Sequence, residues 1–333
     1  EAVGFITGMM GLSQLITSFP AGYLADRYRR DYVLRAGSVM GVTAVFCTLL
    51  AIHQSSFAWL TFAVSTWGMV WGIANTSIMA LFADSLPTSH RTIYFTRRKI
   101  LISLGNATGP VVALIQFYFL GDNWTVRDCA VVFAWGQAVA VPGLVLLWFL
   151  SDDQTLVARL NEERSNEQAV EPLLSVQDDN LDRVAEQQPP PNNSNNSLCL
   201  NLSNQRLIPV LVASADMMAG LSAGTAICYF PIFFSDNLGI GPVVVQLLYF
   251  ASPMGIVFFT LLAEKLAKIK GTMHSRIEIS IIFKWIGVTL MYLMVFCYEK
   301  NMSRTVICVV YVMRTAIINA TGALTKSVLM DNV

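Results

Sequence analysis

Charged residues are scarce in this sequence of 333 residues, since Asp, Glu, Lys and Arg together make up only 13% of it. A water-soluble protein carries about 25%. Hydrophobic residues make up 54%, and a soluble chain of this length could not bury so much apolar surface in one core. The shortage of charge therefore excludes an ordinary soluble protein. The 22 basic and 22 acidic residues balance, so the composition gives no indication of a nucleic-acid partner.

The sequence also lacks the motifs of several catalytic classes. Its six cysteines form no Cys-x-x-Cys pair, and its three histidines lie in or beside the connections between apolar runs. No metal site and no cofactor are therefore predicted. A membrane-embedded enzyme such as an acyltransferase needs a deep catalytic histidine or nucleophile, and the runs hold no histidine of that kind. We therefore expect a protein that is not an enzyme.

Long apolar runs are what the chain has in abundance. A helix needs about 20 such residues to cross the hydrocarbon core of a bilayer. Nine runs reach this length and predict transmembrane helices over residues 2–25, 32–53, 57–83, 95–120, 128–150, 207–233, 242–264, 276–298 and 304–330. The expected fold class is an all-α polytopic membrane protein.

A polar stretch separates the fifth run from the sixth. Residues 151–206 are rich in Asp, Glu, Gln, Asn and Ser and include three consecutive prolines from Pro189. Such a segment cannot bury enough apolar surface to fold alone. The expected organisation is an N-terminal half-bundle over residues 1–150, a disordered linker over residues 151–206, and a C-terminal half-bundle over residues 207–333.

Basic residues are distributed unequally between the two ends of the predicted bundle. One end carries Arg27, Arg29, Arg30, Arg35, Arg91, Arg97, Arg98, Lys99, Lys265, Lys268, Lys270 and Arg276. The other end carries only Arg127, Lys300 and Arg304. Because basic loops remain in the cytoplasm, the arginine-rich end and the linker are predicted to be cytoplasmic. Nothing in this pattern distinguishes the plasma membrane from an organelle membrane.

Two short motifs recur in the second part of the chain. The first run ends in Gly22-Tyr-Leu-Ala-Asp26-Arg27-Tyr-Arg-Arg30, and the seventh ends in Thr260-Leu-Leu-Ala-Glu264-Lys265-Leu-Ala-Lys268. The third run ends in Met79-Ala-Leu-Phe-Ala-Asp84-Ser, and the ninth ends in Lys326-Ser-Val-Leu-Met-Asp331-Asn. Because both pairs are separated by nearly the same length of chain, we expect two related halves that one rotation superposes.

The motif at Gly22 resembles the loop that major facilitator superfamily transporters carry between their second and third helices, although Arg29 stands where a glycine is usual. The resemblance implies a two-half, pseudo-symmetric bundle in which the nine runs are helices 2–10. We therefore expect the chain to be a fragment that lacks helices 1, 11 and 12. It also implies secondary active transport of a small solute by alternating access, in a monomer embedded in the lipid bilayer, with a proton as a candidate coupling ion.

In the resembled family, acids in this loop interact with the start of a neighbouring helix and hold the two halves together on the cytoplasmic side. The resemblance assigns this gating role to Gly22, Asp26, Arg27, Arg30, Asp84, Glu264 and Lys265. Glu264 is expected to reach the start of the fourth run, between Phe95 and Lys99. The alternative is that the basic residues only set the topology.

Ionisable residues deep in a membrane are costly and indicate function. Asp216 and Arg314 lie near the middle of the sixth and ninth runs, which line the central cavity in the resembled family. A carboxylate there could carry a proton, and a guanidinium could hold an anionic solute. The alternative is a structural ion pair between neighbouring helices. Lys284, in the eighth run, is expected to snorkel or to pack between helices.

Uncharged polar residues supply further candidates for the solute site. Asn75 and Thr76 in the third run, beside Trp67 and Trp71, and Gln14 in the first run could line the cavity. Hydrogen bonding between helices is the alternative. Gly105, Gly109 and Pro110 resemble part of the helix-5 motif of drug–proton antiporters, and close packing of two helices is the competing interpretation.

Two function classes besides transport stay open. One is a non-transporting member of the fold that acts as a sensor or scaffold, with the linker recruiting partners. The other is the membrane enzyme considered above. Since no Gly-x-x-x-x-Gly-Lys-Ser/Thr loop is present to bind ATP, transport would be driven by an ion gradient or by the gradient of the solute itself.

Overall fold

The computed structural model describes residues 2–86, 91–151, 229–270 and 273–331. The elements in the first two ranges are α1 (Ala2–Arg27), α2 (Arg30–Gln54), α3 (Phe57–Asp84), α4 (Arg91–Leu120) and α5 (Val126–Trp148). The later elements are α8 (Phe230–Ile232), the π-helical turn η4 (Phe233–Asn237), α9 (Pro242–Lys270), α10 (Met273–Glu299), α11 (Arg304–Ala320) and α12 (Gly322–Asp331). Every element in the described ranges is helical, as expected.

Eight stretches of the described residues are long and apolar enough to cross a membrane, with α11 and the first part of α12 forming one of them. They coincide with eight of the predicted runs, and the prediction of an all-α polytopic bundle is confirmed. The predicted linker, apart from Ser151, and residues 207–228 of the sixth predicted run lie outside the described residues. The division into two halves and a linker stays a prediction.

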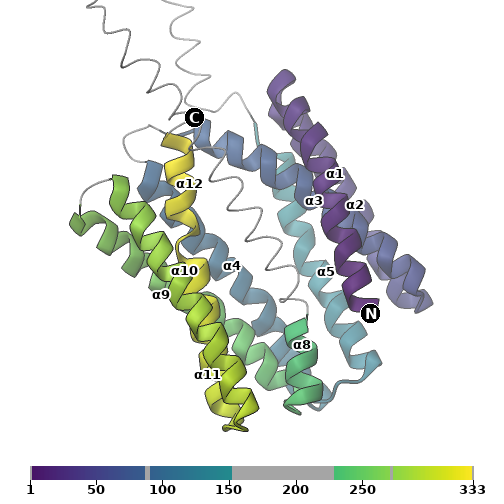
Figure 1. Ribbon diagram of the computed structural model, residues 1–333. Helices are drawn as coiled ribbons and strands as arrows, with labels where there is room; N and C mark the ends of the chain where they lie inside the picture. Colours follow the sequence, from purple (N-terminus) through teal and green to yellow (C-terminus); the bar gives the residue numbers. More distant parts are fainter. Residues whose placement is uncertain (1, 87–90, 152–228, 271–272, 332–333) are drawn as a thin grey trace, which may run out of the picture.

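The same helix pairing occurs on both sides of the bundle. α3 packs against α1 and α2, and α11 packs against α9 and α10 in the corresponding way. Figure 1 shows α1, α2, α3 and α5 on one side and α10, α11 and α12 on the other, with α4 between them. α4 packs far more extensively along α9 than against α5. This recurrence supports the predicted repeat, and it identifies α4 and α9 as the helices through which the two sides meet.

Small residues set the closest approaches between helices in both parts. A side chain at Gly68 of α3 would collide with the carbonyl group of Met10 in α1. A Cβ atom at Gly255 of α9 would lie 2.7 Å from the Cβ of Ala316 in α11. Close backbone approach of this kind compensates for the missing hydrophobic driving force between helices in lipid.

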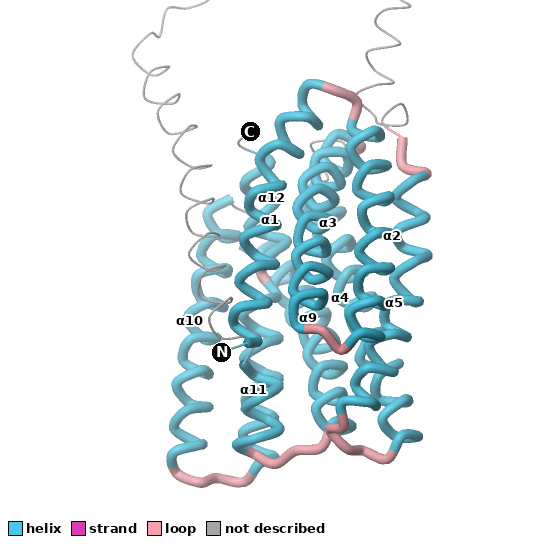
Figure 2. Tube along the Cα trace, turned by 90° about the vertical axis from the view of Figure 1, so that its right-hand side faces the viewer, coloured by secondary structure: helices cyan, strands magenta, loops and turns pink. Residues whose placement is uncertain are grey.

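The ninth predicted run differs from the prediction of one continuous helix. The structure interrupts it at Thr321, between α11 and α12 (Figure 2). A β-branched residue followed by Gly322 favours a helix less than other sequences do. The buried hydroxyl of Thr260 in α9 donates a hydrogen bond to the carbonyl oxygen of Ala320, with an O–O distance of 3.1 Å. This bond adds a partner for a backbone carbonyl group at the interruption.

Candidate functional site

Arg314 lies in the middle part of the membrane-spanning stretch Arg304–Ser327, and its role there stays a prediction. It lies about 15 Å along α11 from the first residue of that helix, at 1.5 Å per residue, which is half of a hydrocarbon core about 30 Å thick. Its central carbon stands 5.7 Å from the centroid of the Phe230 ring, which is a cation–π distance. Its Nε is buried and has no hydrogen-bond partner among the described residues. The group therefore retains unused donor capacity for a ligand.

Aromatic rings form the wall beside this guanidinium. The ring of Tyr311, one helical turn before Arg314, lies 4.8 Å from Phe230 and 4.9 Å from Phe234, measured between centroids. Tyr249 of α9 joins the cluster at 6.5 Å from Tyr311. The chain after residue 228 thus packs Phe230 and Phe234 against Tyr311 of α11. The cluster, Phe230, Phe234, Tyr249 and Tyr311, gives Arg314 a rigid apolar support.

The proposed partner of Arg314 is not placed. Asp216 lies outside the described residues, so the predicted choice between a proton carrier and an ion pair stays open. Lys284 is half-buried on α10, and it forms no ion pair within the described part of the chain. Of these two deep cations, Arg314 is the one for which the described residues define an aromatic environment.

The polar candidates of the N-terminal part lie on α1 and α3. Asn75 is exposed, and so is Trp71 one turn before it, so the two side chains share one face of α3. The hydroxyl of Thr76 donates to the carbonyl oxygen of Gly72 in its own helix at 2.9 Å. Gln14 is half-buried on α1, and its backbone carbonyl group is packed close to Gly72. Asn75 is therefore the candidate whose side chain is most available to a solute.

Other polar side chains in this part serve helix packing. The indole Nε1 of Trp67 donates to the hydroxyl oxygen of Thr48 in α2 at 3.2 Å. That bond matches the alternative of hydrogen bonding between helices, and a place for Trp67 in the cavity stays a prediction. Ser77 of α3 and Gln137 of α5 are buried, and each has a side-chain oxygen without a partner among the described residues.

Two of the predicted gating residues meet at the arginine-rich end. The Nη1 of Arg30, at the start of α2, lies 2.5 Å from the Oδ2 of Asp84, at the end of α3. Sequence reasoning named both residues but not their pairing. It missed the neighbouring Asp31, which is buried at 3% exposure and accepts hydrogen bonds from the guanidinium of Arg29. An acid directly after a run of arginines was the available signal.

The other gating candidates lie along α1 and α9. Arg27 donates to the hydroxyl of Tyr23 in its own helix, and no atom of the described residues outside that helix lies within 4 Å of a Cβ built at Gly22. The side chain of Asp26 is outside the described set. Glu264 forms an ion pair of 2.6 Å with Lys268 one turn later. Its expected contact with the start of α4 stays a prediction, although α9 does pack along α4.

The glycine motif of α4 faces open space within the described structure. No described atom lies within 4 Å of a Cβ built at Gly105 or Gly109. Pro110 lies inside α4, which runs from Arg91 to Leu120 as one helix. The close packing that these glycines predict is therefore not made with any described helix, and it stays a prediction for neighbours outside the described residues.

At the end opposite the arginine-rich loops, here called the outer end, α4 and α9 are joined by side-chain contacts. The Oδ1 of Asp122, just after α4, accepts the backbone N–H of Val243 in the first turn of α9 at 2.8 Å. The indole Nε1 of Trp124 donates to the carbonyl oxygen of Ile240 at 3.1 Å. We call these four residues the outer clamp. Sequence reasoning did not identify it.

The outer clamp satisfies groups that a helix start leaves unpaired. The first N–H groups of a helix have no partner within it, and a carboxylate there is also favoured by the helix dipole. Asp122 can reach α9 because it adopts a left-handed backbone with φ 52°, after Gly121 with φ 111°. The ring of Trp124 packs 5.9 Å from that of Phe117. The turn therefore presents both donor and acceptor to α9 in a fixed orientation.

The match of the chain to known families now adds to this geometry. The family model of the Major Facilitator Superfamily matches residues 1–333. The chain belongs to this superfamily. No curated protein sequence matches it. Membership in the superfamily, together with the eight membrane-spanning stretches among the described residues, makes the chain an integral multi-pass membrane protein of the transporter class. Superfamily members move small solutes and are generally not enzymes.

Proposed function

We propose that this superfamily member is a secondary active transporter that binds a small anionic solute at Arg314 and moves it by alternating access. The observation that carries the proposal is the environment of Arg314. A cation at the middle of a spanning helix is costly, yet the described residues give it the Phe230 ring at a cation–π distance and no ion pair with a carboxylate. A solute with a carboxylate or phosphate group would supply the missing charge through a bidentate contact.

The outer clamp supports the second part of the proposal. In alternating access the two halves separate at one end while they close at the other. Two hydrogen bonds join the predicted halves at the outer end, from Asp122 to Val243 and from Trp124 to Ile240. Bonds of this kind contribute about 0.5–1.5 kcal/mol each, and somewhat more when one partner is charged. They are strong enough to favour the closed outer end and weak enough to break in each cycle.

The driving force is proposed to be the gradient of the solute or of a coupled ion. Asp216 is the candidate proton carrier, since an acid in a cavity-lining run can exchange a proton when the solute occupies Arg314. Asn75 of α3 would contact the uncharged part of the solute from the opposite half. Substrate binding and coupling would thus use residues of both predicted halves.

The test is uptake by the complete protein in proteoliposomes, screened with radiolabelled organic anions with and without a pH gradient. Arg314→Gln should abolish uptake of the anion that the wild type carries. Lys284→Gln, at the other deep cation, is the matched control and should retain uptake. Wild-type uptake by Arg314→Gln would overturn the assignment of Arg314. A complete protein that moves no solute, while its linker binds partners, would favour the alternative of a sensor or scaffold.

A further inference from the structure

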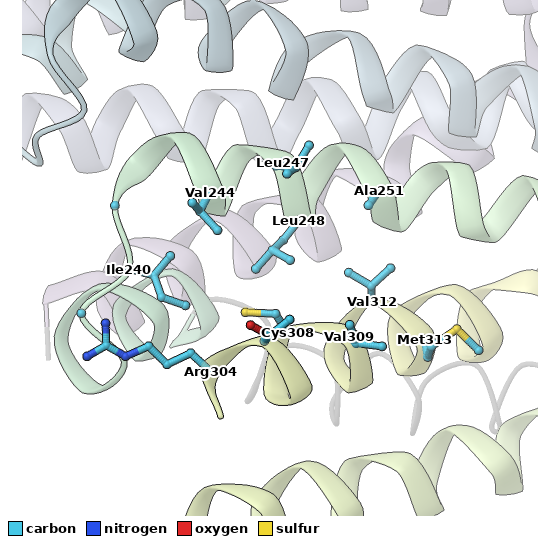
Figure 3. A pocket seen from close by; sticks show the side chains of 13 residues that line it. Ile240, Val244, Leu247, Leu248, Ala251, Arg304, Cys308, Val309, Val312 and Met313 are labelled. Carbon is cyan, nitrogen blue, oxygen red and sulfur yellow. The ribbon is translucent and has the colours of Figure 1, made fainter. Parts of the chain in front are cut away.

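A cavity of about 630 Å³ lies between α9 and α11 at the outer end (Figure 3). Its walls are aliphatic on both helices, with Val244, Leu247 and Ala251 on α9 and Val309, Val312 and Met313 on α11. Its volume is in the range of small-molecule sites. Several of these side chains are substantially exposed in the described structure, including Leu247 at 51% and Val309 at 57%. The walls therefore suit an apolar occupant.

Among the described residues that line the cavity, one is charged, and it lies at one end. Arg304, the first residue of α11, lines the rim next to Ile240 (Figure 3). Its guanidinium reaches over the loop before α9, where Nη2 lies 3.9 Å from a Cβ built at Gly239. The side chain is exposed, and it forms no ion pair with any residue in the described ranges. The cavity therefore offers a cation at the outer rim and hydrocarbon below it.

The charged rim and the apolar walls of the cavity match the polar surface and the hydrocarbon core of the bilayer. Pro242 and Arg304 each begin a spanning stretch, so the rim lies at the level where the hydrocarbon core begins. From Arg304 to Met313 the wall descends about 14 Å into the core, at 1.5 Å per residue. A water-soluble ligand would find few hydrogen-bonding groups along this depth. An amphiphile with one anionic group and a long alkyl chain matches the whole length.

We propose that this cavity, a groove between α9 and α11, is a binding site for one glycerophospholipid, with its phosphate on Arg304 and one acyl chain between the two helices. Charge complementarity at the rim and apolar walls below it specify this occupant. The proposal does not depend on the identity of the transported solute. It also links the lipid to the outer clamp, because Ile240 lines the groove and its carbonyl oxygen accepts the bond from Trp124. Bound lipid should therefore favour the clamped outer end.

Native mass spectrometry of the complete protein, with phosphatidylglycerol added in detergent, tests the rim. Arg304→Ala should weaken retention of the lipid about fivefold, as expected for one basic residue at a membrane surface. Arg127→Ala is the matched control, since Arg127 also lies at the outer start of a spanning helix, α5, and it should leave retention unchanged. Equal losses in the two variants would overturn the proposal, because they would indicate general electrostatic attraction only.

Two further measurements test the walls. Val309→Trp should fill the groove and remove the retained lipid while Arg304 stays in place, in protein whose thermal unfolding is unchanged. A photoreactive benzoylphenylalanine at Met313, irradiated in nanodiscs of phosphatidylcholine and phosphatidylglycerol, should give a lipid adduct. A cross-link from this position to another segment of the complete chain, or to a second protein, would instead show that a polypeptide occupies the groove and would overturn the proposal.

Discussion

The carboxylate of Asp122 accepts the backbone N–H of Val243, which is 121 residues later in the chain, at a distance of 2.8 Å. The acid follows α4, and the amide belongs to the first turn of α9, so one side chain caps a helix of the other predicted half. Asp and Asn are the side chains that helix starts prefer as caps. A cap supplied from the opposite half links the stability of α9 to the closure of the outer end.

The first prediction removes this cap. Asp122→Ala should favour separation at the outer end, because the loss of a helix cap costs about 0.5–2 kcal/mol and shifts a two-state equilibrium constant by a factor of about 2 to 30. Spin labels at Gln54 and Lys300, the outer ends of α2 and α10, should report a larger share of long distances in the complete protein.

Asp128 provides the control for this prediction. It lies in the same connection, but its interactions are with Thr125 at the start of its own helix. Asp128→Ala should therefore leave the distance distribution as it is in the wild type. A distribution that is unchanged in Asp122→Ala would show that the cap does not hold the outer end closed.

The second prediction perturbs the contact between Asp122 and α9 by a substitution in the loop before α9. A Cβ atom at Gly241 would lie 2.8 Å from the carboxylate of Asp122, closer than real side chains allow. Gly241→Ala should displace Asp122 and reproduce the distances seen with Asp122→Ala. Gly8→Ala is the control, because a Cβ there meets nothing within 4 Å among the described residues. The combined variant Asp122→Ala/Gly241→Ala should show little further change, and an additive effect would argue against a shared mechanism.

The membrane-spanning helices could be predicted from the sequence because the bilayer sets the length and the polarity of each one separately. A run of about 20 apolar residues must satisfy its backbone internally, so it is helical whatever it packs against. The arginine-rich motif likewise predicted the residue types at one end. It could not predict that Arg30 pairs with Asp84, since a motif specifies residues and not their partners.

Contacts between segments that are distant in the sequence could not be predicted from apolar runs and short motifs. The interruption at Thr321 lies within an apolar pattern that continues to α12, and its extra hydrogen bond comes from Thr260, 60 residues earlier. The outer clamp depends on how α4 and α9 pack. The sequence signals were the loop glycines Gly121 and Gly239, which adopt φ values of 111° and 59°, and glycine in a loop is too common to identify a contact.

The third prediction concerns the interruption of α11. Thr260→Val preserves the shape of the side chain but removes the donor to the carbonyl oxygen of Ala320. The buried bond should contribute about 0.5–1.5 kcal/mol, which corresponds to a decrease of about 1–2 °C in the midpoint of thermal unfolding for a protein of this size. Thr289→Val is the control, because that hydroxyl is exposed and donates only to its own helix. Equal midpoints for the two variants would contradict a specific role for Thr260.

The last prediction concerns the ion pair between Arg30 and Asp84. Its side chains are 20% and 35% exposed, so it is partly desolvated and joins the start of α2 to the end of α3. Asp84→Asn should lower the free energy of unfolding by about 1.5–3 kcal/mol, the range for hydrogen bonds to charged groups, and should slow uptake if this end closes in the cycle. Lys268→Gln breaks the pair with Glu264 within one helix, in which the lysine side chain is 62% exposed, and should cost only about 0.3–0.5 kcal/mol. The exchange Arg30→Asp/Asp84→Arg keeps both charges, so it should recover part of the loss measured by unfolding in detergent. An exchange variant less stable than Asp84→Asn would show that Arg30 acts through its other contacts at the start of α2, and not through this pair.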